Sequence, residues 1–172
     1  MKFKFLILLL AITLGCKSTQ TDIEKAQSED VFNALKTLVD SKQMVFEAQV
    51  AYPFQTNDVI EVSNVLMRQT ENANGRFSLS ANEDYLEIKI DSAKGRLSFF
   101  GELRMASYSD SRDSQIEFDN LVRDYKVKVN EKKKSILVSF KVKNETEQFN
   151  IKLLLFPNQK GNLTVYGSNR TT

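Results

Sequence analysis

Apolar and polar residues alternate with period two along most of the chain after Gln43, and this alternation restricts the fold more than any other feature. It is clearest in three segments, whose apolar positions are Tyr125, Val127 and Val129; Ile136, Val138, Phe140 and Val142; and Phe149, Ile151, Leu153 and Leu155. Successive side chains of a strand point to opposite faces of a sheet. Each segment therefore predicts a strand with one dry face and one wet face.

The connections between these segments are short and polar, covering residues 130–134, 144–147 and 157–161. Parallel neighbours would need a crossover connection of a dozen residues or more, so we expect an antiparallel meander. Weaker alternation earlier in the chain adds further strands. We predict a mainly β (α+β) fold, a curved antiparallel sheet or sandwich of about eight to ten strands, with a closed barrel as the alternative closure.

One segment before the strands has helical spacing. Its apolar positions follow the i, i+3, i+4, i+7, i+8 pattern of an amphipathic face and are Val31, Ala34, Leu35, Leu38 and Val39. Ser28 stands where an N-cap is expected. This pattern predicts a single helix over residues 29–42 that packs on the domain's own sheet.

The N-terminus has the layout of an export signal. Lys2 and Lys4 precede an apolar run over residues 5–14, which is shorter than the ~20 residues that span a bilayer. Gly15 and Cys16 follow, and this ending resembles the bacterial lipobox, in which the signal is cleaved before a cysteine that carries diacylglycerol. We expect residues 1–15 to be a lipoprotein signal peptide, cleavage between Gly15 and Cys16, and lipidation of Cys16 with acyl chains such as palmitate.

The remaining chain divides into two parts. Residues 16–28 are polar and free of aromatic side chains, so we expect the lipidated cysteine to be followed by a flexible tether. Residues 29–172 are long enough for a single β-rich domain with its own core. Cys16 is the one cysteine of the sequence, which excludes a disulfide within the chain.

Charge balance argues against one class of partner. The precursor has 24 Lys and Arg against 22 Asp and Glu, and two of the lysines leave with the signal peptide, so the mature chain is close to neutral. Nucleic-acid binding depends on neutralising phosphates with a basic excess or stripe. We therefore expect no nucleic-acid partner.

The residue inventory also excludes common catalytic sites. The chain has no histidine, so Ser-His and Cys-His nucleophile pairs and the usual zinc ligand sets cannot form. Candidate carboxylates such as Glu83, Asp84, Asp110 and Asp113 lie in hydrophilic segments and are interpreted as turn residues. We expect no metal, no cofactor and no enzymatic activity. The alternative is a histidine-free carboxylate hydrolase acting on envelope or carbohydrate substrates.

The most distinctive segment of the mature chain is KGRLSFFG, residues 94–101. Two glycines bracket Phe99 and Phe100, and Tyr108 and Phe118 follow. These four aromatic residues are a candidate surface for an apolar ligand or an envelope protein, and ordinary core packing is the alternative.

Three stretches together resemble a known family. GRLSFFGE, ASYSDSRDSQIEF and the closing LLLFPNQKGNLTVYGSNR are similar to the lipoproteins of Bacteroidetes classed as domain of unknown function 4251. The resemblance covers residues 29–170, with Ser98 and Phe99 at positions where the family usually has proline and tyrosine. It implies a cell-envelope location and supplies no activity.

In Bacteroidetes, two further sequence features indicate location and modification. No acidic cluster follows Cys16, which favours the periplasmic face of the outer membrane over the cell surface. Asp91-Ser92-Ala93 fits the pattern that receives O-glycans on exported proteins, so Ser92 is a candidate glycosylation site. The sequence thus predicts an uncharacterised envelope lipoprotein, a monomer held to the membrane through Cys16, acting as a non-enzymatic periplasmic binding or interaction module.

Overall fold

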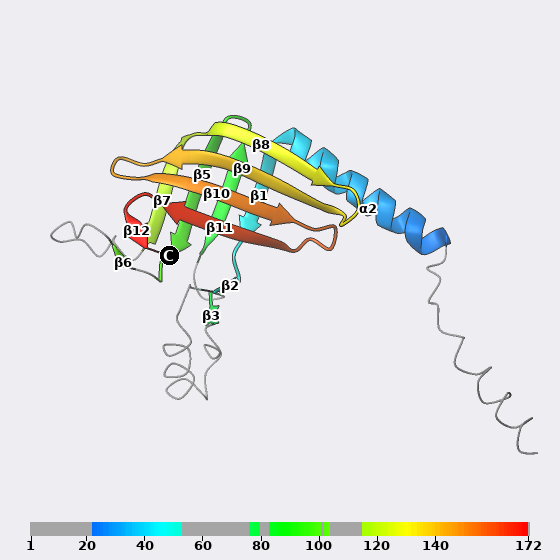
Figure 1. Cartoon of the computed structure of the whole chain (residues 1–172), viewed down its shortest axis with the longest axis horizontal. Helices are drawn as coiled ribbons and strands as arrows, with labels where there is room; N and C mark the ends of the chain where they lie inside the picture. The colour runs from blue at the N-terminus through cyan, green and yellow to red at the C-terminus, as the bar shows by residue number, and fades with distance from the viewer. Residues whose placement is uncertain (1–21, 53–75, 80–82, 101, 104–114, 172) are drawn as a thin grey trace, which may run out of the picture.

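A computed structural model describes residues 22–52, 76–79, 83–100, 102–103 and 115–171 of the chain. Its strands form two four-stranded antiparallel sheets, which we call the first and second sheet, and two short ribbons. The second sheet lies in front of the first in Figure 1, and its strands run across those behind it. The predicted antiparallel β fold with an N-terminal helix is confirmed. Because the two main sheets share no hydrogen-bonded strand pair, they form a sandwich and not a closed barrel.

The first sheet has the order β1-β4-β5-β7, and the second is a meander in the order β8-β9-β10-β11. The strands of the first sheet are β1 (Gln43–Glu47), β4 (Tyr85–Lys89), β5 (Ser92–Ser98) and β7 (Gln115–Leu121). Those of the second are β8 (Arg123–Asn130), β9 (Ser135–Lys143), β10 (Gln148–Leu155) and β11 (Gly161–Gly167). In the ribbons β2 (Val50–Ala51) pairs with β3 (Phe77–Ser78), and β6 (Glu102–Leu103) pairs with β12 (Arg170–Thr171).

The two sheets are joined at a corner where β7 continues into β8 through Val122. Asp124 has a left-handed backbone with φ 55°, and the register of β8 against β9 shifts between Arg123 and Lys126. Such a bulge bends the strand, so the chain leaves the first sheet and enters the second. This bend sets the crossed packing of the sandwich.

The core fills the space between the sheets. Its side chains from the second sheet are Ile136, Val138, Phe140, Val142, Phe149, Ile151 and Leu153, and those from the first include Leu86, Ile88, Leu97, Ile116 and Phe118. The alternation predicted for β9 and β10 is therefore confirmed. In β8 the prediction is confirmed for Tyr125, which packs against the core, and wrong for Val127 and Val129, which are exposed. β8 is an edge strand, and its inner face lies beyond the main contact of the second sheet with the first, between β7 and β9.

The helix α2 (Asp22–Ser41) begins seven residues before the predicted start at residue 29. Ser28 consequently lies inside the helix and is not its N-cap. The added turns come from a polar segment that contains Glu, Lys, Ala and Gln, all good helix formers. The tether predicted over residues 16–28 therefore gives way to helix from Asp22, because a polar composition does not distinguish a flexible segment from an exposed helix.

The buried stripe of α2 is also rotated relative to the prediction. Phe32 and Val39 are buried and Leu35 packs against the core, whereas Val31 and Leu38 are 47% and 46% exposed. Because Phe32 and not Val31 is buried, the helix is rotated about its axis by the angle between consecutive residues, about 100°. The larger ring buries more apolar area, which favours this orientation.

Ion pairs fix α2 to the turn between β8 and β9. Lys36 Nζ lies 2.6 Å from Glu131 Oε1, and Lys134 pairs with Glu29. Both ammonium groups also lie over the Phe32 ring, 4.6 and 5.2 Å from its centroid. The middle of the helix is therefore held beside one end of the second sheet.

Candidate functional site

Five residues singled out in the sequence lie outside the described part of the chain. They are Gly15, Cys16, Tyr108, Asp110 and Asp113. Signal cleavage before Cys16 and its lipidation therefore stay predictions.

The three other aromatic candidates have different surroundings. Phe118 is 4% exposed and packs on Phe149, with ring centroids 5.6 Å apart. Phe99 is half-buried against the core, and Phe100 is 40% exposed and stacks on Phe77 at 4.8 Å. Phe118 thus belongs to the core and not to a ligand surface, and Phe100 is the described ring of this set that remains most open to solvent.

The position of Phe118 depends on Gly95. The two residues are register partners on β7 and β5, and a Cβ on residue 95 would overlap the ring, lying 2.9 Å from Cε1 and Cε2. The glycine therefore leaves the space into which the ring folds. The sequence analysis noted the two glycines that bracket Phe99 and Phe100, but it did not predict that the Phe118 ring would cover Gly95.

Ser92 is the first residue of β5, directly after the two-residue turn Ile90–Asp91. Its side chain is half-buried, and Oγ donates a hydrogen bond to the carbonyl oxygen of Lys89 at 3.1 Å. A glycan at Ser92 would have to replace this bond. Glycosylation of Ser92 stays a prediction.

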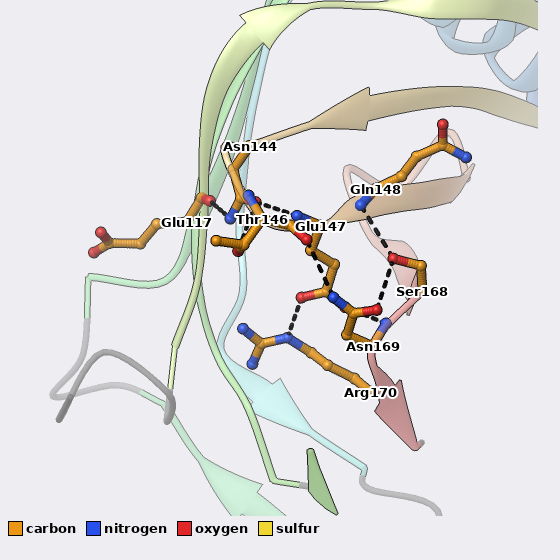
Figure 2. Close-up of polar contacts among 8 residues, drawn as sticks. All are labelled: Glu117, Asn144, Thr146, Glu147, Gln148, Ser168, Asn169 and Arg170. Atoms are coloured by element: carbon orange, nitrogen blue, oxygen red, sulfur yellow. Dashed lines mark hydrogen bonds and ion pairs between the residues drawn. The ribbon is translucent and has the colours of Figure 1, made fainter. Parts of the chain in front are cut away.

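Glu147 and Arg170 form a buried ion pair that the sequence analysis did not find (Figure 2). Arg170 Nε lies 2.8 Å from Glu147 Oε2, and the side chains are 8% and 3% exposed. The other carboxylate oxygen accepts a hydrogen bond from the backbone N–H of Asn169 at 3.0 Å. The guanidinium also lies 4.6 Å from the centroid of the Phe99 ring. Both carboxylate oxygens are thus engaged within the fold.

Asn144 organises the turn that carries Glu147. Its side-chain oxygen accepts hydrogen bonds from the backbone N–H groups of Thr146 and Glu147 at 3.0 and 2.8 Å. Its side-chain nitrogen donates to the carbonyl oxygen of Glu117 on the first sheet at 2.9 Å. Figure 2 shows how these contacts join the β9–β10 turn to β7 and to the chain after β11. We call this arrangement of Asn144, Glu147, Asn169 and Arg170 the clasp.

Asp84 is a second buried carboxylate, 5% exposed. It accepts hydrogen bonds from the backbone N–H of Ser98 and from Ser98 Oγ, the latter at 3.0 Å. The interpretation of Asp84 as a solvated turn residue is therefore wrong. Its carboxylate links the start of β4 to the end of β5, whereas Glu83 is exposed.

The outer face of the second sheet carries the most distinctive surface. The strands β8 to β11 contain six cationic residues, Arg123, Lys126, Lys128, Lys141, Lys143 and Lys152, and one acidic residue, Asp124. Their register places all six cations opposite the core-facing positions: Lys126 faces Ser139, Lys128 faces Leu137, and Lys152 also faces Ser139. We call this surface the cationic face. In Figure 1 it turns toward the viewer.

The outer face of the first sheet has a different charge pattern. Its strands hold three cationic and four acidic residues, and the cations lie in ion pairs: Lys89 with Glu87 at 2.8 Å, Lys94 with Asp119 at 3.3 Å and Arg96 with Glu117 at 3.5 Å. Charges are thus nearly balanced on one face of the sandwich and predominantly positive on the other. The near-zero net charge of the mature chain gave no indication of this segregation, because it sums the charges of both faces.

The cationic face is hollowed by a shallow depression of about 460 Å³. Lys126, Lys141 and Lys152 line it together with Tyr166 and the single acid, Asp124. Lys141 Nζ lies 2.7 Å from Asp124 Oδ2, and this hydrogen bond and charge hold the pKa of Asp124 below its ordinary value. Asp124 therefore stays ionised and neutralises Lys141, which leaves the other cations of the face to attract an anion.

The sequence matches the family described as Domain of unknown function (DUF4251) over residues 26–172. The chain belongs to the DUF4251 family. The family resemblance seen in the sequence is thus confirmed. No curated protein matches the sequence.

A solved DUF4251 structure supports the fold. The crystal structure of a family member from Bacteroides eggerthii DSM 20697 is similar with a TM-score of 0.53 and 16% identity, covering 83% of this chain and 81% of that chain. In this DUF4251 protein, no helix within the described residues is long and apolar enough to cross a membrane. The described residues also contain no group of three or more Asp, Glu or Cys side chains arranged to hold a metal ion.

Proposed function

We propose that this DUF4251 protein is a lipid-anchored, non-enzymatic binding module of the cell envelope that presents its cationic face to an anionic ligand. The observation that carries the proposal is the segregation of charge. Six cations and one acid occupy β8 to β11, whereas the strands of the other sheet are balanced. A solvated face needs charge for solubility but not an excess of one sign, and a predominantly positive surface raises the local concentration of anionic ligands.

The carboxylates favour binding over catalysis. A carboxylate hydrolase needs two acids that face a substrate, one of them free to donate a proton. The buried acids among the described residues, Asp84 and Glu147, instead accept hydrogen bonds or an ion pair from Ser98, Asn169 and Arg170. They hold strands together, which supports a structural role for both.

The N-terminal sequence supports the proposed membrane anchor. The basic start, the short apolar run and the Gly15-Cys16 ending support export and lipidation. Thioether-linked diacylglycerol supplies two acyl chains, and two chains are enough for stable membrane attachment.

A soluble polyanion tests the binding function. Fluorescently labelled dextran sulfate is titrated with the protein from Lys17 onward, and anisotropy is measured at low and high salt. We expect saturable binding that weakens with salt and with the variant Lys126→Gln/Lys128→Gln/Lys152→Gln. The matched control, Lys89→Gln/Lys94→Gln/Arg96→Gln, removes the same charge from the other sheet. Equal loss of binding in both variants would reject the cationic face as the binding surface.

A further inference from the structure

We infer that the anionic ligand of the cationic face is the membrane surface itself, so that β8 to β11 lie against phosphate headgroups. This inference rests on the proposed function and names its ligand. The six cations come from three neighbouring strands: Arg123, Lys126 and Lys128 from β8, Lys141 and Lys143 from β9, and Lys152 from β10. Neighbouring strands are ~4.8 Å apart and alternate residues of one strand ~6.6 Å apart, so the charges cover an area and not a line. An area of separated charges fits a sheet of headgroups better than a single extended polymer.

The uncharged side chains of this face also suit a membrane interface. Leu137 and Leu154 are register partners on its outer side and are half-buried. Tyr166 is 38% exposed, and Lys152 Nζ lies 5.3 Å from its ring centroid. Tyrosine is enriched at the headgroup level of bilayers, where its ring is in contact with apolar chains and its hydroxyl with water. The face therefore combines cations with an amphipathic ring and two apolar side chains.

The helix that follows the predicted anchor is held at one end of the second sheet. The ion pairs Lys36–Glu131 and Lys134–Glu29 hold α2 beside the β8–β9 turn, and the chain enters α2 at Asp22. Five residues lie between Cys16 and Asp22, and the six steps along this segment reach at most ~20 Å when it is extended. A domain tethered so closely meets the membrane at a high effective concentration. Lys132 and Lys133, exposed in the same turn, add positive charge at this end.

Vesicles test the inference without the anchor. The protein from Lys17 onward contains all the buried core residues of the described part, the first of which is Phe32, so it is expected to fold without the signal. Co-sedimentation is measured with vesicles of phosphatidylcholine and with vesicles of equal parts phosphatidylcholine and phosphatidylglycerol. We expect binding to the anionic vesicles, weakened by salt because screening is effective beyond ~10 Å at 0.1 M.

Variants locate the contact. Each lysine removed is expected to lower the vesicle partition coefficient about fivefold, which corresponds to ~1 kcal/mol. Lys126→Gln/Lys128→Gln/Lys152→Gln should therefore lose roughly a hundredfold, whereas Lys89→Gln/Lys94→Gln/Arg96→Gln should stay within about threefold. Circular dichroism checks that both variants fold.

The outcomes separate the two proposals. Binding to anionic vesicles that depends on the cationic face supports both. Binding to dextran sulfate without binding to anionic vesicles overturns the membrane inference and leaves the proposed function in place. Binding to neither overturns both, and equal loss in the two triple variants assigns vesicle binding to net charge and rejects the face.

Discussion

The Phe118 ring covers Gly95, its partner on the neighbouring strand, so closely that a Cβ on residue 95 would lie 2.9 Å from two ring carbons. The same ring packs on Phe149 of the second sheet, and through it Gly95 influences the contact between the sheets. A glycine in a strand interior is usually unfavourable. Here it is required by the ring above it.

We expect Gly95→Ala to destabilise the domain by about 1–3 kcal/mol, the cost of overpacking a filled core. Urea denaturation followed by circular dichroism measures the change. The control is Arg96→Ala on the same strand, whose exposed ion pair with Glu117 contributes within about 1 kcal/mol. Equal stability of Gly95→Ala and the parent protein would show that the ring can move without cost.

Charge removal from the buried pair tests the clasp. Glu147→Gln keeps an acceptor for the Asn169 N–H but removes the negative charge beside the Arg170 guanidinium, and we expect a loss of about 3–5 kcal/mol. The double variant Glu147→Gln/Arg170→Met should lose less than the sum of the single variants, because it leaves no buried charge. An additive double-mutant cycle would contradict coupling between the two groups. Asp119→Asn, which breaks an exposed pair with Lys94, is the control.

Tyr125 gives a pH-dependent prediction. Within the described part of the chain its buried hydroxyl has no hydrogen-bond partner, and burial, together with the nearby Asp40, raises its pKa above the ordinary value of 10.0. Above that pH the folded state keeps a proton that the unfolded state loses, so stability falls as pH rises through and beyond 10.0. Tyr125→Phe should remove this decline.

At neutral pH the same variant should be more stable than the parent by about 1 kcal/mol, because an unsatisfied buried hydroxyl is replaced by an apolar ring edge. Thermal unfolding at pH 7 and at several values above 10 measures both effects. Tyr166→Phe is the control, since that ring is exposed on the cationic face. A loss of stability in Tyr125→Phe at neutral pH would indicate that the hydroxyl has a partner.

The adjacent rings Phe99 and Phe100 should differ in their contribution to stability. Phe99 packs on the core and lies under the Arg170 guanidinium, so Phe99→Ala is expected to cost about 3 kcal/mol. Phe100 is 40% exposed and contacts Phe77, so Phe100→Ala should cost about 1 kcal/mol. Chemical denaturation of the two variants side by side checks the order. Equal losses would mean that both rings are core residues.

Lipidation of Cys16 is tested in cells. Cys16→Ser removes the thiol that carries diacylglycerol, and each buried CH₂ of an acyl chain contributes ~0.8 kcal/mol to membrane binding. We expect the variant to leave the detergent phase in phase-partitioning experiments and to lose labelling by radioactive palmitate. Unchanged partitioning would place the anchor elsewhere.

The type of fold was predictable from local sequence patterns. Alternation in β9 and β10 identified which side chains would be buried, because a strand places alternate residues on opposite faces whatever it packs against. Short polar connections likewise required antiparallel neighbours, and the order of β8 to β11 follows from them. The family could also be identified from local segments such as GRLSFFGE.

The surfaces and contacts that the strands form depend instead on packing between distant segments. The orientation of α2 depended on fitting Phe32 beside the β8–β9 turn, and the exposure of Val127 and Val129 depended on where the first sheet ends. The Glu147–Arg170 pair joins residues 23 positions apart, and the cationic face collects side chains from separate strands. Local patterns set the period of each strand, but pairing and packing between distant segments place charges and rings together in space.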